Sequence, residues 1–198
     1  MADPWDIPLP IVADYDESPL YEALGRAVDR WEHIEWTLSM LYSLFVGDHT
    51  FLSMREYGAN GNIFRDRLAG LERAADAWFV KNCNQSAEGE FNRLMVAARG
   101  FSDRRNEFAH GVVANVAPHI FWRCRLLSAP EPDRYLVVPP IYIVRKYDEY
   151  GLPTFGFSSF ELEILHNRMQ FLELDLALLM DDLWPRTFFP PEWRAELG

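Results

Sequence analysis

Apolar residues recur every three or four positions over most of this chain, which is the spacing of helices that bury one face. The first repeat begins at Ser18 and Pro19, which favour a helix start, and Gly47 follows it as a helix end. Further repeats cover residues 49–58, 62–81, 86 to about 112, and 159–183. The pattern therefore predicts four long helices and one short helix.

The last predicted helix is apolar on two sides. One stripe contains Leu165, Met169, Leu172, Leu176, Leu179 and Leu183. The other contains Ile164, Phe171, Leu174 and Leu178. A helix with two apolar sides is either buried between layers or lies at a subunit interface.

Between about 118 and 157 the period shortens to two. Ile120, Trp122, Cys124 and Leu126 alternate with other residues, and residues 135–144 are rich in β-branched and aromatic side chains. This pattern predicts two or three short strands in a small β-hairpin sheet. The expected fold is mainly α, an antiparallel helical bundle with this hairpin inserted before the last helix.

The flanks of the predicted helical domain, residues 18–183, differ from it in composition. Residues 1–17 contain three prolines and five acidic residues, which predicts an extended arm. Residues 184–198 are rich in proline and aromatic residues, which predicts an irregular tail. Ser158 and Glu161 have the spacing of a capping box and should begin the last helix.

Composition narrows the function classes. The 198 residues are 49% hydrophobic and 25% charged, as in globular proteins, and the net charge is −11. A chain this acidic is a poor general binder of nucleic acids or membrane surfaces, because both carry negative charge. Any RNA must therefore bind in a local basic pocket. We find no signal peptide and no membrane-spanning run, so we expect a cytoplasmic protein. We also find no zinc spacing among its two cysteines and no glycine-rich phosphate loop, so we expect no cofactor.

One basic island stands out in this acidic chain. Residues 91–105 contain four arginines and one acid, Asp103. Arg105 occupies the centre of an apolar stripe, and Glu35 does the same on the first helix. A buried guanidinium is costly unless it is paired, so we predict that Glu35 and Arg105 form an ion pair.

The segment Arg105-Asn106-Glu107-Phe108-Ala109-His110 resembles the RX4-6H motif of HEPN-domain proteins, in the form Arg-Asn-x-x-x-His. The predicted helical architecture agrees with that family. The resemblance implies an all-α, usually dimeric fold in which two motifs face each other. Its active members are metal-independent endoribonucleases, so we expect such an enzyme of the toxin, defence or stress type.

The same resemblance assigns roles to individual residues. His110 becomes the general acid or base on the ribose 2′-OH or the leaving 5′-oxygen, because imidazole titrates near neutrality. Arg105 binds the scissile phosphate, Asn106 orients His110 or the phosphate, and Glu35 holds Arg105. The implied product carries a 2′,3′-cyclic phosphate, and no metal takes part.

Further expectations concern the surroundings of the motif. Arg99 and Arg104 are additional cations that should support the site. On an unbroken helix, Arg105 and His110 lie about 140° apart. The helix must therefore distort near residues 109–111, or the two groups must come from different subunits. The expected partners are RNA, a second copy of the chain, and a cognate antitoxin or other protein, with no membrane.

Two other readings compete with the nuclease. A non-catalytic interaction or assembly module would keep the same fold. A di-metal carboxylate bundle would use two Glu-x-x-His pairs and two further glutamates. The candidates are Glu107 with His110, Glu163 with His166, and Glu32, Glu35 or Glu72. Because Glu107 and Glu163 point about 140° and 160° from the apolar stripes of their helices, we rank this reading third.

Overall fold

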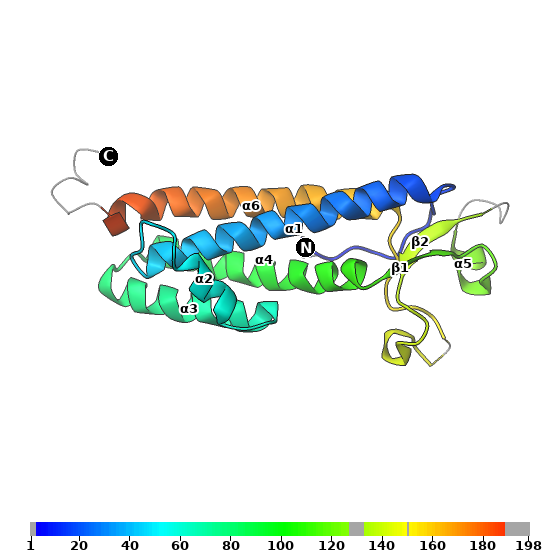
Figure 1. Cartoon of the computed structure of the whole chain (residues 1–198). Coiled ribbons are helices and arrows are strands. Elements are labelled where there is room, and N and C mark those ends of the chain that lie inside the picture. Colours follow the sequence, from blue (N-terminus) through cyan, green and yellow to red (C-terminus); the bar gives the residue numbers. More distant parts are fainter. Residues whose placement is uncertain (1–2, 127–132, 150, 189–198) are drawn as a thin grey trace. The chain divides into compact units, whose positions relative to one another are not determined.

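A computed structural model describes residues 3–126, 133–149 and 151–188 (Figure 1). Its elements are the helices α1 (Glu17–Phe45), α2 (Met54–Ala59), α3 (Phe64–Lys81), α4 (Gln85–Ala109), α5 (Ile120–Arg125) and α6 (Ser159–Phe188), the strands β1 (Val112–Asn115) and β2 (Tyr135–Val138), and the 3-10 turn η1 (Val144–Lys146). The protein is mainly helical with a small two-stranded antiparallel hairpin, as predicted. No helix among the described residues is both long and apolar enough to cross a membrane.

Two helices begin one residue before the predicted starts at 18 and 86. The Ser18 amide donates to Asp16 Oδ1 at 2.7 Å, so Asp16 caps α1 in place of Ser18. The Ala87 amide donates to Asn84 Oδ1 at 3.3 Å, so Asn84 caps α4. Each cap is an Asp or Asn with a short acceptor side chain that reaches a free amide of the first turn.

The predicted capping box at the start of α6 is confirmed. The Ser158 amide donates to Glu161 Oε2 at 2.9 Å, and the Phe160 amide donates to Ser158 Oγ at 3.2 Å. Asp14 adds a second cap, because its carboxylate accepts the Ser159 amide at 2.7 Å. The N-terminal arm is therefore tied to the first turn of α6.

The strand prediction was correct in one place and wrong in another. β2 lies within the predicted segment, but residues 120–125 form helix α5, and β1 lies where the third long helix was expected to end. Trp122 and Leu126 are both buried, and their separation of four residues fits one face of a helix as well as alternate positions of a strand. Over so short a run the two periods are indistinguishable.

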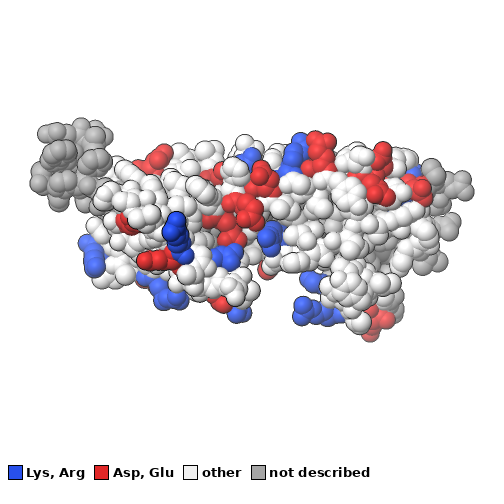
Figure 2. All heavy atoms as spheres, in the orientation of Figure 1, with Lys and Arg blue, Asp and Glu red and all other residues white. Residues whose placement is uncertain are grey.

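The described chain divides into two compact units. Unit 1 comprises Met1–Trp31 and Phe101–Met169, and unit 2 comprises Glu32–Gly100 and Gln170–Gly198. Acidic and basic side chains are interspersed over the face drawn in Figure 2. A phosphate-binding site therefore has to be a local arrangement of a few cations.

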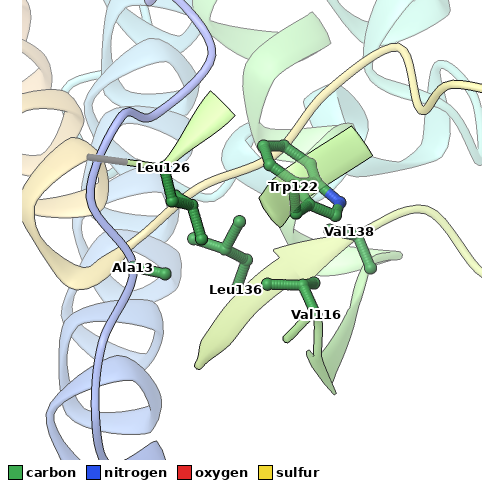
Figure 3. Packing of buried hydrophobic residues seen from close by; sticks show 6 residues of the cluster. All are labelled: Ala13, Val116, Trp122, Leu126, Leu136 and Val138. Carbon is green, nitrogen blue, oxygen red and sulfur yellow. The ribbon is translucent and has the colours of Figure 1, made fainter. Parts of the chain in front are cut away.

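Unit 1 has a small apolar core around the hairpin (Figure 3). It consists of Ala13, Val116, Trp122, Leu126, Leu136 and Val138, with Leu9 and Ala114 packed against it. Arg125 donates to the carbonyl oxygens of Pro10 and Leu9 at 3.1 and 2.8 Å, which holds the N-terminal arm against this core. The arm, the hairpin and α5 are thus one packed structure.

In unit 2, three ion pairs and one histidine–carboxylate contact connect four helices. The ion pairs are Glu35–Arg67 (α1–α3), Glu72–Arg99 (α3–α4) and Arg93–Asp175 (α4–α6), and His33 Nδ1 of α1 lies 3.6 Å from Glu173 Oε1 of α6. Near the ends of α1 and α3, the Phe45 ring packs edge-on against Trp78 and Phe91, with centroids 5.8 and 5.3 Å apart. This order is consistent with the predicted bundle.

The two apolar stripes of α6 behave differently. Every residue of the first, from Leu165 to Leu183, is buried, as predicted. In the second, Phe171, Leu174 and Leu178 are 68, 54 and 58% exposed. Burial between layers is therefore wrong for these three residues within the described chain, and the subunit-interface alternative stays a prediction.

Helix α6 is longer than the sequence predicted. It continues to Phe188 with Pro185 inside it, so residues 184–188 are helical and not irregular. The Trp184 ring stacks on Phe51 with centroids 5.6 Å apart, which anchors this last turn. The rest of the predicted irregular tail, residues 189–198, lies outside the described residues.

Candidate functional site

The predicted histidine lies directly beyond the end of α4. The helix ends at Ala109, and His110 occupies an exposed turn before β1. Gly111 allows this sharp exit, because a Cβ there would lie 2.4 Å from the Val137 side chain of β2. The separation of about 140° expected between Arg105 and His110 assumed an unbroken helix. It does not apply here, because His110 lies outside the helix.

The other two motif residues lie on the last turns of α4. Asn106 is exposed and Arg105 is half-buried. Arg105 Nη1 lies 3.4 Å from Asn106 Oδ1, a long hydrogen bond that directs the Asn106 carbonyl toward Arg105. Within the described residues the His110 ring makes no hydrogen bond or ion pair, so the expected orientation of His110 by Asn106 stays a prediction.

Glu107, in the middle of the motif, is buried beside Arg104. Arg104 Nη1 lies 2.9 Å from Glu107 Oε2, and the two side chains are 27 and 10% exposed. Neither the Arg104 Nε nor the Glu107 Oε2 makes a hydrogen bond to any described residue. Burial raises the pKa of Glu107, and the nearby charges of Arg104 and Lys146 oppose that rise.

Lys146 is a cation near this segment that the sequence analysis missed. It ends the turn η1, and its ammonium lies 5.6 Å from the centre of the Phe155 ring. Its charge acts on the Glu107 carboxylate. The only feature of the sequence that could have indicated Lys146 is the basic pair Arg145-Lys146 after an apolar run. No residue pattern near that pair connects it with α4.

Glu35 is held by a residue that the sequence analysis did not consider. Arg67 donates from Nε and Nη2 to Glu35 Oε2 at 3.0 and 2.7 Å, and from Nη2 to Oε1 at 2.5 Å. The side chains of Arg67 and Glu35 are 19 and 14% exposed. Burial lowers the pKa of Arg67, but the bonds and charge of Glu35 outweigh this and raise it overall. Such a bidentate arginine–carboxylate pair is among the stronger hydrogen-bonded interactions in proteins.

Glu35 lies at the edge of the buried face of α1, not at its centre. The centre is formed by Trp31, Ile34 and Leu38. Glu35 belongs to unit 2 and Arg105 to unit 1, so the predicted Glu35–Arg105 pair stays a prediction.

Tyr57 completes the polar cluster around Glu35. Its hydroxyl is buried, and burial together with the Glu35 charge raises the pKa of Tyr57, while Arg67 opposes the rise. The phenol therefore remains protonated throughout the physiological range. The cluster is a structural link between α1, α2 and α3.

The two supporting arginines have carboxylate partners. Arg99 in unit 2 bonds to Glu72 of α3, and Arg104 in unit 1 pairs with Glu107. Arg104, Arg105, Asn106 and His110 thus belong to one helix end in unit 1, whereas Arg99 and Glu35 belong to unit 2.

Four of the five glutamates of the di-metal alternative act as ion-pair partners. Glu163 bonds to Arg26, and Glu35, Glu72 and Glu107 pair with Arg67, Arg99 and Arg104. Among the described residues, no three His, Cys, Asp or Glu side chains are grouped so that they could hold a metal ion.

Comparisons of the chain with family models, with curated proteins and with solved structures find no match. The resemblance to HEPN domains therefore rests on the six residues 105–110 and on the helical architecture around them.

Proposed function

We propose that this protein is a HEPN-like, metal-independent endoribonuclease of the toxin, defence or stress type. The observation that carries the proposal is the exposed His110 directly after α4, with Arg105 and Asn106 on the last turns of the same helix. An accessible imidazole supplies a proton-transfer group, and an arginine five residues earlier in the chain supplies a phosphate-binding group. RNA provides a hydroxyl to deprotonate next to a phosphate to bind.

In the proposed reaction, the His110 imidazole accepts the proton of the ribose 2′-OH. The 2′-oxygen then attacks the adjacent phosphorus, and the bond from phosphorus to the 5′-oxygen breaks. The leaving 5′-oxygen takes up a proton from an imidazolium, which we assign to His110 of a second copy. The products are a 2′,3′-cyclic phosphate and a 5′-hydroxyl, and the proton balance is zero.

The cations near the end of α4 have a defined task in this reaction. Arg105 binds the non-bridging phosphate oxygens, where negative charge grows in the transition state. Arg104 is fixed by Glu107, and Lys146 adds charge from the hairpin side. In this proposal, these few cations together provide the local positive charge by which a chain with a net charge of −11 binds RNA.

The proposal includes a homodimer in the cytoplasm. In it, the antiparallel bundles of two copies bring both motifs to one groove, through the ends of their motif helices. Each copy then contributes one His110 and one Arg105 to the bound RNA.

The decisive experiment compares His110→Ala with wild type on mixed RNA in EDTA. We expect His110→Ala and Arg105→Ala to lose cleavage by at least about 100-fold, since acid–base catalysis contributes roughly that much. His119→Ala is the matched control, because His119 is also exposed and lies outside the motif. Product ends are assayed for the 2′,3′-cyclic phosphate, and melting temperatures confirm the fold. Cleavage by His110→Ala at the wild-type rate, or no cleavage by wild type, contradicts the proposal.

A second candidate is a non-catalytic interaction module with the same fold. It is favoured by the hydrogen bond from Arg105 Nη1 to Asn106 Oδ1. This bond turns the Asn106 side-chain carbonyl toward Arg105, whereas the nuclease proposal needs Asn106 to orient His110 or the phosphate. RNA binding without cleavage, lost equally in Arg104→Ala and Arg105→Ala but kept in His110→Ala, would identify this candidate.

A further inference from the structure

One face of α6 in unit 2 exposes three large apolar side chains on successive turns. Phe171, Leu174 and Leu178, here called the outer stripe, are 68, 54 and 58% exposed. Their spacing of three and four residues aligns them along about 10 Å of helix. Aligned apolar side chains on a surface mark an interaction site more often than scattered ones do.

Acidic side chains border the outer stripe. Leu178 also lines a groove of about 250 Å³ between the start of α4 and α6, together with Glu90, Asp175 and Asp182. Arg93 donates to both Glu90 and Asp175, so one guanidinium offsets part of the charge of the three carboxylates that line this groove. Asp181 is exposed on the same stretch of α6. The surface is therefore apolar along the stripe and carries an excess of acidic groups beside Leu178.

These charges select among the possible occupants. A second copy would bring the same acidic border against itself, and like charges at an interface oppose association. An anionic membrane surface or a nucleic acid carries the same unfavourable sign. A helix with an apolar stripe and flanking lysines or arginines matches both the spacing and the charge, and it packs by the usual helix-in-groove mode.

We propose that the outer stripe and its acidic groove form a docking site for a basic amphipathic helix of another protein. Apolar side chains of that helix cover Phe171, Leu174 and Leu178, and its basic side chains reach Asp175 and the groove. The site is independent of the proposed RNA cleavage, because it uses no residue of the motif.

The test uses the full chain and a designed helical peptide with leucine at every third or fourth position and lysine between. We expect binding by wild type, and a loss of affinity of about tenfold or more in the triple variant Phe171→Ser, Leu174→Ser and Leu178→Ser. The same peptide with glutamate in place of lysine should not bind. In Asp175→Asn, affinity should fall and depend less on salt.

A matched control separates this surface from general stickiness of an acidic chain. Trp36, Leu52 and Val80 are 64, 66 and 80% exposed elsewhere in unit 2, and changing all three to serine should leave peptide affinity unchanged. Equal binding by the outer-stripe variant, equal binding of the glutamate peptide, or no binding by wild type overturns the proposal. Sedimentation equilibrium gives a further outcome: a wild-type dimer that the outer-stripe variant makes monomeric assigns the surface to a second copy and also overturns it.

Discussion

Two partly buried arginine–carboxylate pairs differ in how completely their polar atoms are hydrogen-bonded. In unit 2, Arg67 donates three hydrogen bonds to both oxygens of Glu35. In unit 1, Arg104 contacts a single oxygen of Glu107, and neither its Nε nor that oxygen makes a hydrogen bond within the described chain. The first pair joins two helices, whereas the second lies within the last turns of one helix.

This difference in hydrogen bonding indicates that the Glu35–Arg67 pair stabilises the fold, whereas the Glu107–Arg104 pair is a candidate for a functional role. A saturated pair, in which the buried polar atoms have hydrogen-bond partners, stabilises the folded protein. An unsaturated pair costs stability, and such costs persist in proteins mainly where another role requires them. The unsaturated pair lies in the segment 104–110 that carries the proposed catalytic residues, which agrees with that distinction.

The largest effect is expected from breaking the saturated pair. Glu35→Ala leaves the Arg67 guanidinium buried and without its principal partner, which should cost about 3–5 kcal/mol of unfolding free energy. Urea unfolding measures this, and the double variant Glu35→Ala with Arg67→Met should recover part of the loss. A cost below about 1 kcal/mol would mean that water reaches the pair and that it resembles a surface contact.

A smaller loss should follow from Gly111→Ala at the exit from α4. The added methyl group would meet Val137 at 2.4 Å, and such overpacking costs about 1–3 kcal/mol. Gly89→Ala, within α4, is the control, because nothing lies within 4 Å of its new methyl group. Alanine is the better helix former, so Gly89→Ala should stabilise the protein by up to about 1 kcal/mol. Equal melting temperatures for both variants would contradict the close contact at Gly111.

The pH dependence of stability should reveal the unsaturated pair. The folded-state pKa of Glu107 is raised above its ordinary value of 4.5 because the carboxyl group is buried. The folded protein therefore holds more protons than the unfolded chain just above pH 4.5, so this group lowers stability as pH rises through that window. Urea unfolding from below pH 4.5 to neutrality should show a steeper decline in wild type than in Glu107→Gln. Superimposable pH profiles would show that Glu107 titrates normally.

The smallest effect is expected from Arg99→Gln. The Arg99 side chain is 48% exposed in its pair with Glu72, and exposed pairs contribute under about 1 kcal/mol. RNA cleavage should also remain at the wild-type rate if Arg99 only links α3 to α4. A loss of cleavage similar to that of Arg105→Ala would return Arg99 to the supporting role that the sequence suggested.

Periodicity predicted the long helices well, because each buries a face over several turns. The buried stripe of α6 agrees with the sequence analysis, and so does the end of α1 shortly before Gly47, where φ is +77°. Prediction failed at residues 120–125, where Trp122 and Leu126 fit either a helix or a strand. Only the packing of the hairpin and the N-terminal arm against these two side chains distinguishes the two structures.

The sequence by itself determined the helical character of this protein and the start of its last helix, and it contains the segment 105–110 that resembles the RX4-6H motif. These features depend on local spacing, which the order of residues contains directly. Only the tertiary structure decided that Glu35 binds Arg67, that Glu107 is buried beside Arg104, and that the outer stripe of α6 remains exposed. Each of these depends on which distant side chains fill the space around a residue, and helical periodicity is the same whether a face meets a neighbour or water.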